Sequence, residues 1–153
     1  MQFIFTPMTV DYARAIVAWH YDGIYSFYDL EQDREDLEEF LHPKAWEDKY
    51  FAVLNEEDGL IGFFSFSKED KAVVVGLGLR PDHTGRGLGL EFVQAGLEFA
   101  GKRFAPSIFR LIVATFNQRA IRVYEKAGFR HDRVFIHETN GGKYEYLQMI
   151  REA

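Results

Sequence analysis

The hydrophobic and polar positions of this chain follow two different periods, and the changes between them divide it into strands and helices. Short apolar runs bounded by turn residues predict strands, whereas apolar residues three and four positions apart predict amphipathic helices. We therefore expect strands at residues 3–5, 50–54, 60–67, 73–80, 109–116, 130–137 and 144–150. Helices are expected from the N-cap Thr9 to about Trp19, over about 32–41, from a glycine-rich segment to about Gly101, and between Asn117 and Gly128.

The order of these elements, β-α-α-β-β-β-α-β-α-β-β, predicts one α/β domain over residues 1–153. We expect a mixed, mostly antiparallel sheet flanked by helices. The runs 73–80 and 109–116 are apolar on both faces, which is typical of central strands that are covered on both sides. Residues 20–29 follow neither period, so they are expected to form a loop.

Composition narrows the classes of function. The net charge of −6 argues against general affinity for nucleic acid or anionic membranes. The absence of cysteine excludes disulfides, thiolate metal sites and a cysteine nucleophile, and the five histidines show no close ligand spacing, so we predict no metal. The chain shows no signal peptide and no run of about 20 apolar residues, which predicts a cytoplasmic protein with no membrane partner.

A glycine-rich stretch, RPDHTGRGLGL at residues 80–90, connects the strand 73–80 to the next helix. Three glycines without Cβ atoms let a ligand approach the backbone, and the free N–H groups of a helix's first turn favour an anion. The stretch is therefore interpreted as a phosphate or pyrophosphate cradle, with a glycine-rich turn that binds nothing as the alternative. Its spacing matches neither a Walker A loop nor a dinucleotide fingerprint.

A second informative stretch runs from Ala114 to Phe129. Asn117, Ala120 and Tyr124 fall at helical spacing and share one face, with Asn117 suited to be the N-cap. Taken alone, this pattern indicates an amphipathic helix. Side chains on its other faces are expected to be solvated, and these are Gln118, Arg122, Glu125 and Lys126.

Both stretches resemble motifs of the GNAT N-acetyltransferase superfamily. The acyl-CoA loop of that family reads Arg/Gln-x-x-Gly-x-Gly/Ala, and here it reads Thr84-Gly85-Arg86-Gly87-Leu88-Gly89, with Thr in the first position. The second stretch is similar to the family signature Asn-x-x-Ala-x-x-x-Tyr-Glu-Lys-x-Gly-Phe. The resemblance covers nearly the whole chain and is most specific from Val73 to Phe129.

This resemblance implies an enzyme that transfers an acetyl group from acetyl-CoA directly to a primary amine. Acetyl-CoA would lie in a splay between strands 73–80 and 109–116, with its pyrophosphate on the amides of the glycine-rich loop. Tyr124 would act as the general acid for the CoA thiolate, and an N–H group at a bulge near Leu77 to Leu79 would stabilise the oxyanion. The implied cofactor-binding residues are Leu77, Leu79, Thr84, Gly85, Arg86, Gly87, Leu88, Gly89, Asn117, Ala120 and Tyr124.

Two points stay open at the level of sequence. Gly76 and Gly78 share one face of their strand, which fits either the pantetheine arm or a closely packed helix. Strand 73–79 contains no acid, so the base for the amine could be Asp22, His83, Glu145 or ordered water. We expect His83 to be a solvated turn residue.

The acceptor is expected to bind against residues 20–29. Aromatic rings beside carboxylates suit an ammonium group, so we predict that the acceptor pocket is lined by Tyr21, Asp22, Tyr25 and Tyr28. The alternative is that these rings only cover the edge of the sheet. A small-molecule or peptide amine is the expected partner of a monomer or homodimer, and the competing functions are a non-catalytic acyl-CoA sensor and a purely structural domain.

Overall fold

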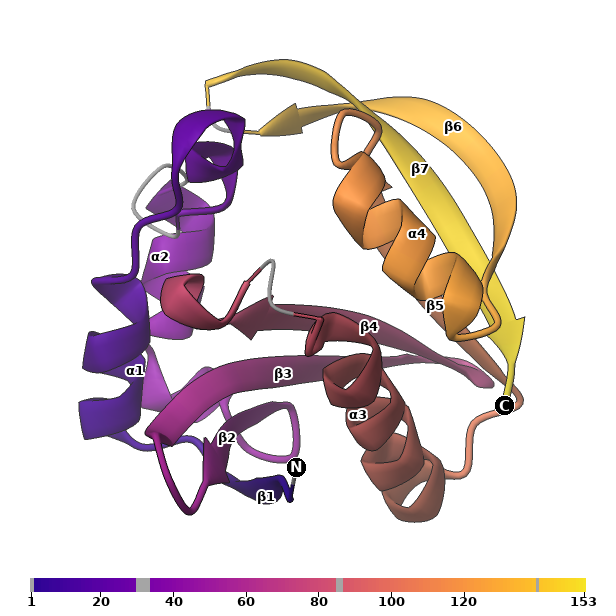
Figure 1. Cartoon of the computed structure of the whole chain (residues 1–153). Coiled ribbons are helices and arrows are strands. Elements are labelled where there is room, and N and C mark those ends of the chain that lie inside the picture. Colours follow the sequence, from indigo (N-terminus) through magenta and orange to yellow (C-terminus); the bar gives the residue numbers. More distant parts are fainter. Residues whose placement is uncertain (1, 30–33, 85–86, 140) are drawn as a thin grey trace.

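The computed structural model describes residues 2–29, 34–84, 87–139 and 141–153. Within them seven strands form one sheet in the order β1-β2-β3-β4-β5-β7-β6 (Figure 1). Every neighbouring pair is antiparallel except β4 and β5, which confirms the predicted mixed sheet. The strands are Ile4–Pro7 (β1), Tyr50–Asn55 (β2), Gly59–Glu69 (β3), Ala72–Leu79 (β4), Ile108–Ala114 (β5), Arg130–Thr139 (β6) and Gly142–Glu152 (β7).

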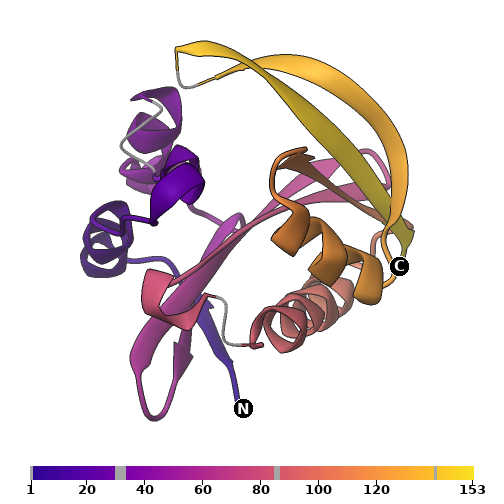
Figure 2. The same cartoon turned by 45° about the horizontal axis from the view of Figure 1, so that its top comes forward.

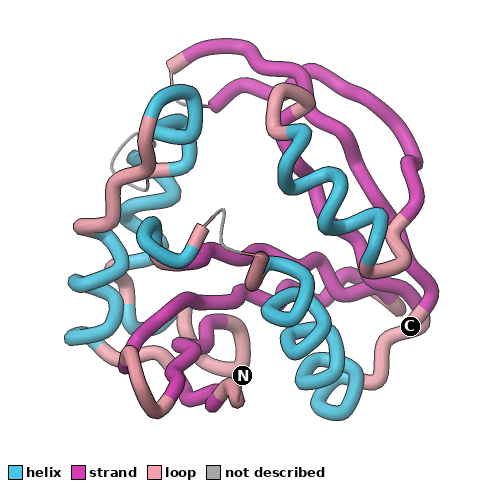
Figure 3. Tube along the Cα trace, viewed as in Figure 1, coloured by secondary structure: helices cyan, strands magenta, loops and turns pink. Residues whose placement is uncertain are grey.

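The helices, which are cyan in Figure 3, follow one another along the chain in the predicted order. The α-helices are Val10–Val17 (α1), Arg34–Phe40 (α2), Gly89–Phe104 (α3) and Gln118–Lys126 (α4), and the 3-10 helices are Gly23–Tyr28 (η1), Pro43–Ala45 (η3) and Pro81–His83 (η4). The expectation of a loop over 20–29 is wrong for η1, because six residues are too few to show a period. Residues 32 and 33 of the second predicted helix lie outside the described residues.

Two clusters of buried side chains lie on opposite faces of the sheet. On one face, Ile16 of α1 and Phe40 of α2 pack with Tyr50 and Ala52 of β2. On the other face, α3 and α4 pack over a larger cluster that includes Phe64 of β3. The functional elements are therefore anchored to a core that covers both faces of the sheet.

The sheet splits between its two parallel strands. β4 and β5 pair only over Ala72–Val74 and Ile108–Arg110, and from there β5 continues along β7. Figure 2 shows the hairpin of β6 and β7 curving away from the half of the sheet that holds β1 to β4. The splay implied by the family resemblance is thus present in the fold.

The glycines of β4 have a packing role that the sequence interpretation did not include, and both also line a cavity described below. A Cβ atom at Gly76 would collide with the Ser65 hydroxyl, and one at Gly78 would collide with the Phe63 ring. Ser65 and Phe63 lie directly opposite these glycines on β3. The glycines therefore make room for side chains of the neighbouring strand rather than for a helix.

Helix α3 lies close to β3, and this contact is testable through two of its glycines. A methyl group at Gly96 would overlap the Phe64 ring, whereas one at Gly101 would meet nothing within 4 Å. Gly96→Ala is expected to lower the free energy of unfolding by about 1–3 kcal/mol through overpacking. Gly101→Ala is expected to raise it by about 0.4–1 kcal/mol. Chemical denaturation measures both, and a Gly96→Ala protein as stable as wild type would contradict this packing.

Candidate active site

Two cavities meet inside the split of the sheet. The first, of about 410 Å³, lies among α1, η1, β3 and β4 and is called the aromatic cavity below. The second, of about 480 Å³, lies among β4, α3 and α4 and is called the α3–α4 groove. Seven residues line both and define the junction, namely Leu77, Leu79, Thr84, Asn117, Arg119, Ala120 and Tyr124.

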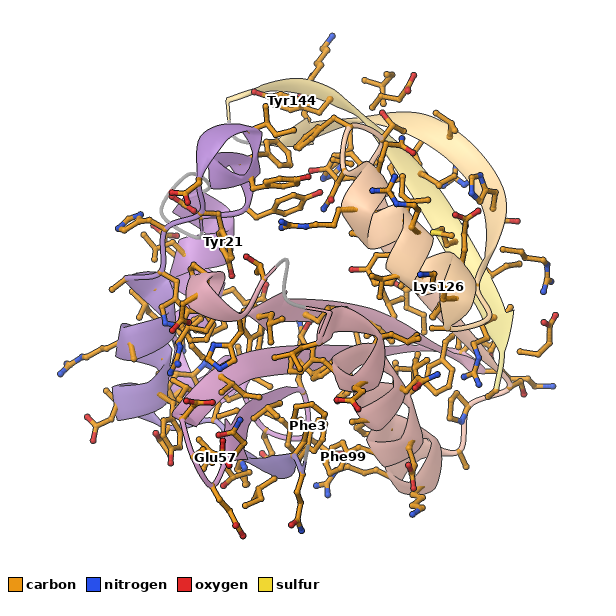
Figure 4. The ribbon with its side chains drawn as sticks, viewed as in Figure 1. Phe3, Tyr21, Glu57, Phe99, Lys126 and Tyr144 are labelled. Atoms are coloured by element: carbon orange, nitrogen blue, oxygen red, sulfur yellow. The ribbon has the colours of Figure 1, made fainter. Side chains whose placement is uncertain are left out.

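A third hollow, of about 500 Å³, adjoins the aromatic cavity at the N-terminal end of η1. It is called the outer hollow, and its lining includes Asp22 and Tyr25 together with Thr84 and Arg119 of the junction. Figure 4 shows Tyr21, from the chain just before η1, and Lys126, on α4, on opposite sides of the split.

The split leaves backbone groups of β4 without a neighbouring strand. The N–H of Arg80 donates to the Ile61 carbonyl at 2.7 Å. Because alternate residues of an antiparallel strand bond to the same neighbour, the backbone N–H and C=O groups of the even-numbered residues of β4 point toward β3. The N–H groups of Leu77 and Leu79 consequently face the split, where β5 has already diverged. Pairing of β4 with β3 runs without a register shift, so the expected bulge is wrong and the splay itself frees these groups.

Helix α4 presents a tyrosine hydroxyl at the junction. The Asn117 side chain caps the helix by accepting the Ala120 N–H at 3.1 Å, which orients the first turn. Tyr124 lies on the same face and packs edge-on against Phe129. Among the described residues its hydroxyl has no hydrogen-bond partner. Burial, with a smaller contribution from Tyr28, raises the pKa of the Tyr124 hydroxyl, which keeps it a neutral donor.

Tyr21, just before η1, and Tyr28, the last residue of η1, use their hydroxyls differently from Tyr124. The Tyr21 hydroxyl donates to the Leu79 carbonyl at 2.8 Å, on the β4 edge of the split. The Tyr28 hydroxyl accepts the Ala114 N–H at 3.3 Å, on the β5 edge. Burial raises the pKa of both hydroxyls. These two groups therefore hold backbone in place, in contrast to Tyr124.

The other two predicted acceptor residues lie further out. The Arg119 guanidinium lies over the Tyr25 ring, 4.2 Å from its centroid. Asp22 is exposed and lines only the outer hollow. Tyr21 and Tyr25 line both the aromatic cavity and the outer hollow, whereas Tyr28 lines the aromatic cavity. The structure therefore gathers all four predicted residues around two adjoining spaces.

The glycine-rich loop borders the α3–α4 groove. Gly87 has a φ of 78°, a left-handed conformation, and both it and Gly89 line the groove. The Thr84 hydroxyl donates to the Pro81 carbonyl at 2.7 Å, so it closes the preceding turn. Leu88 stands at the N-cap of α3 and does not line the groove, and Gly85 and Arg86 lie outside the described residues.

The expectation that His83 is solvated is wrong, because only 2% of this residue is exposed. Its ring nitrogens lie 2.9 Å from an Asp82 carboxylate oxygen and 3.2 Å from an Asp58 carboxylate oxygen. Arg80, together with His83, holds the pKa of the Asp82 carboxyl well below its ordinary value. This cluster anchors the turn before the glycine-rich loop, and His83 lines none of the three spaces.

The two acidic candidates for the base, Asp22 and Glu145, also lie outside the aromatic cavity. Glu145 is exposed and lines none of the three spaces, and Asp22 reaches only the outer hollow. Within the described ranges no group of three His, Cys, Asp or Glu residues could hold a metal ion. No described helix is long and apolar enough to cross a membrane.

Three cationic residues of α4 are absent from the predicted site. Arg119, Arg122 and Lys126 all line the α3–α4 groove, whereas the helical pattern predicted only solvated positions for the last two. Their spacing of three and four positions places them in one stripe along the helix. That spacing is the signal that could have identified them.

The chain resembles known acetyltransferases in sequence. Mycothiol acetyltransferase of Clavibacter sepedonicus is 34% identical over 106 residues, which are 67% of this chain, and the match covers 34% of that protein. The chain thus matches about a third of the length of this curated relative.

Solved structures share the fold over nearly the whole chain. Spermidine N-acetyltransferase from Vibrio cholerae, in complex with CoA and spermine, superposes with a TM-score of 0.79 at 18% identity, over 99% of this chain and 95% of that one. A GNAT-family acetyltransferase from Bacillus anthracis gives a TM-score of 0.78 at 18% identity and the same coverage. The sequence model of the acetyltransferase (GNAT) domain matches residues 2–130. The chain therefore belongs to the GNAT acetyltransferase family.

Proposed function

We propose that residues 1–153 act as one domain that transfers an acetyl group from acetyl-CoA to a primary amine. The observation that carries this proposal is the Tyr124 hydroxyl, which has no partner among the described residues and lies where two cavities meet. Acetyl-CoA would enter through the α3–α4 groove, and the amine would enter through the aromatic cavity. The two reactants would then face each other at the junction.

The residues of the groove fit acetyl-CoA. Gly87 and Gly89 let phosphates approach the backbone, and the cationic side chains of Arg122 and Lys126 line the same space. Leu77 and Leu79 line the groove too, and their outward N–H groups suit the oxygen of a thioester carbonyl. When bound, acetyl-CoA supplies an activated acetyl group.

The transfer forms a C–N bond and breaks a C–S bond, so the amine loses a proton and the sulfur gains one. In this proposal Tyr124 donates the proton to the departing sulfur as the C–S bond breaks. The N–H groups of Leu77 and Leu79 stabilise the negative charge that develops on the carbonyl oxygen. Ordered water takes the proton from the amine, since His83 and Glu145 line none of the three spaces and Asp22 reaches only the outer hollow.

Two measurements test the proposal together. Calorimetry measures the binding of acetyl-CoA, and a thiol assay measures the release of CoA in the presence of a panel of primary amines. Binding with amine-dependent release supports the transferase. Binding without release for any amine would support the alternative, a non-catalytic acyl-CoA sensor, and the absence of binding would point to a structural domain.

The acceptor is proposed to be a small-molecule amine. Two of the relatives named above are a spermidine N-acetyltransferase and a mycothiol acetyltransferase, and these names indicate small-molecule chemistry of two different kinds. A cytoplasmic location, a monomeric or homodimeric state, and the lack of nucleic-acid or membrane partners stay predictions from the sequence.

A further inference from the structure

The wall of the aromatic cavity indicates which chemical groups the acceptor carries besides its amine. Apart from the junction, aromatic rings make up most of its lining, and they include Trp19, Tyr21, Phe27, Phe40, Tyr50 and Phe63. Such rings stabilise apolar and aromatic groups by excluding water and by stacking. The cavity therefore suits an aromatic or aliphatic group.

The carboxylate in this wall is already engaged. Among the lining residues that the structure describes, Asp29 is the one acidic side chain, and only 6% of it is exposed. One of its oxygens accepts the Tyr21 N–H at 2.8 Å, and the other lies 3.0 Å from the His20 Nδ1 atom. Asp29 thus holds the chain before η1 in place. Because both of its oxygens are engaged, it is poorly placed to bind an ammonium group of the acceptor.

Arg119 is the cationic side chain of the same wall. Among the described residues no carboxylate or carbonyl group pairs with its guanidinium, which lies over the Tyr25 ring. Tyr25 lines the aromatic cavity and the outer hollow but not the α3–α4 groove. The charged end of Arg119 therefore lies on the amine side of the junction, with N–H donors available to an anionic group.

We propose, on the basis of the function proposed above, that the acceptor is an apolar amino acid whose carboxylate binds Arg119 and whose side chain enters the aromatic cavity. A guanidinium pairs with a carboxylate through two parallel hydrogen bonds, which would fix the amine relative to the junction. A polyamine would instead bring positive charge close to Arg119, and like charges repel. The preferred acceptor of this chain would thus differ from spermidine.

The test compares acceptors that differ only in the carboxylate. Phenylalanine and phenylethylamine form one pair, leucine and 3-methylbutylamine form another, and spermidine represents the polycations. Wild type is expected to prefer each amino acid over its matched amine in kcat/KM by about 10- to 100-fold, the range for a hydrogen-bonded charged pair. In Arg119→Gln this preference should disappear through a higher KM for the amino acid.

The variants also distinguish effects on acceptor binding from effects on acetyl-CoA binding. Arg119→Gln should raise the KM of phenylalanine about 10- to 100-fold more than the KM of phenylethylamine, which has no carboxylate to lose. The matched control is Arg122→Gln on the same helix, which should raise the Kd of acetyl-CoA and keep the preference for the carboxylate, since Arg122 lines only the groove.

Two results would overturn this inference while leaving the transferase intact. One is acetylation of amines with no preference for a carboxylate, or with a preference for spermidine. The other is an Arg119→Gln protein that binds acetyl-CoA weakly and keeps the preference, which would assign Arg119 to the cosubstrate. Failure to release CoA with any acceptor, despite acetyl-CoA binding, would instead contradict the proposed function.

Discussion

Replacing Tyr124 with Phe is expected to lower kcat by about 10²- to 10⁴-fold, the usual contribution of a positioned general acid. The substitution removes one hydroxyl from the junction and keeps the ring that packs against Phe129. Because this hydroxyl has no partner among the described residues, its loss should leave no protein group unsatisfied. The Kd of acetyl-CoA should stay within about twofold of wild type. Single-turnover kinetics and calorimetry measure the two quantities.

The control for this variant is Tyr12→Phe. Tyr12 lies on α1 outside the three spaces, so its variant should keep wild-type activity. Burial raises the pKa of the Tyr124 hydroxyl, so wild type should keep its acid protonated and show no loss of kcat from this group below pH of about 10. A Tyr124→Phe protein with full activity would mean that water protonates the thiolate.

Replacing Gly87 with Glu is expected to weaken acetyl-CoA binding by at least about 100-fold, through backbone strain and charge repulsion together. Gly87 has a φ of 78°, a backbone angle that residues with a side chain rarely adopt. It also lines the groove proposed for the phosphates. A Cβ at this position meets no atom of the described residues within 4 Å, so the protein should still fold. Calorimetry measures the loss, and thermal unfolding checks the fold.

Gly87→Gln is the matched control, since it has the size of Glu without the charge. Its loss of affinity for acetyl-CoA should reflect backbone strain alone, so it should bind acetyl-CoA better than Gly87→Glu. The difference between the two variants should shrink as salt is added, because salt screens exposed charges. Equal and undiminished affinity in both variants would exclude this loop as the phosphate site.

Much of the fold could be predicted from the sequence because its signals are local. The period of apolar residues identified the order of strands and helices, and helical spacing placed Asn117, Ala120 and Tyr124 on one face of α4. The glycine-rich loop could be found in the same way, since it depends on residue types within one short segment. Such features need no knowledge of distant parts of the chain.

The features that could not be predicted depend on neighbours far away in the sequence. His83 is buried in a cluster that includes Asp58, which lies 25 positions earlier and 3.2 Å from its ring. Gly76 is needed because Ser65 lies opposite it on another strand. The place of Arg119 depends on the Tyr25 ring, which comes from another element altogether. The free N–H groups of β4 follow from the splay of two strands rather than from a local bulge.

The hydrogen bonds that flank η1 have a consequence for how the two substrates influence each other. Tyr21, just before η1, binds the β4 edge of the split, and Tyr28, the last residue of η1, binds the β5 edge, so the segment from Tyr21 to Tyr28 connects both edges. A movement of η1 on one side of the junction must therefore alter the separation of the edges on the other side, or break one of these bonds. Cooperativity between amine and acetyl-CoA would then pass through η1, and by thermodynamic linkage each substrate would change the affinity of the other by the same factor.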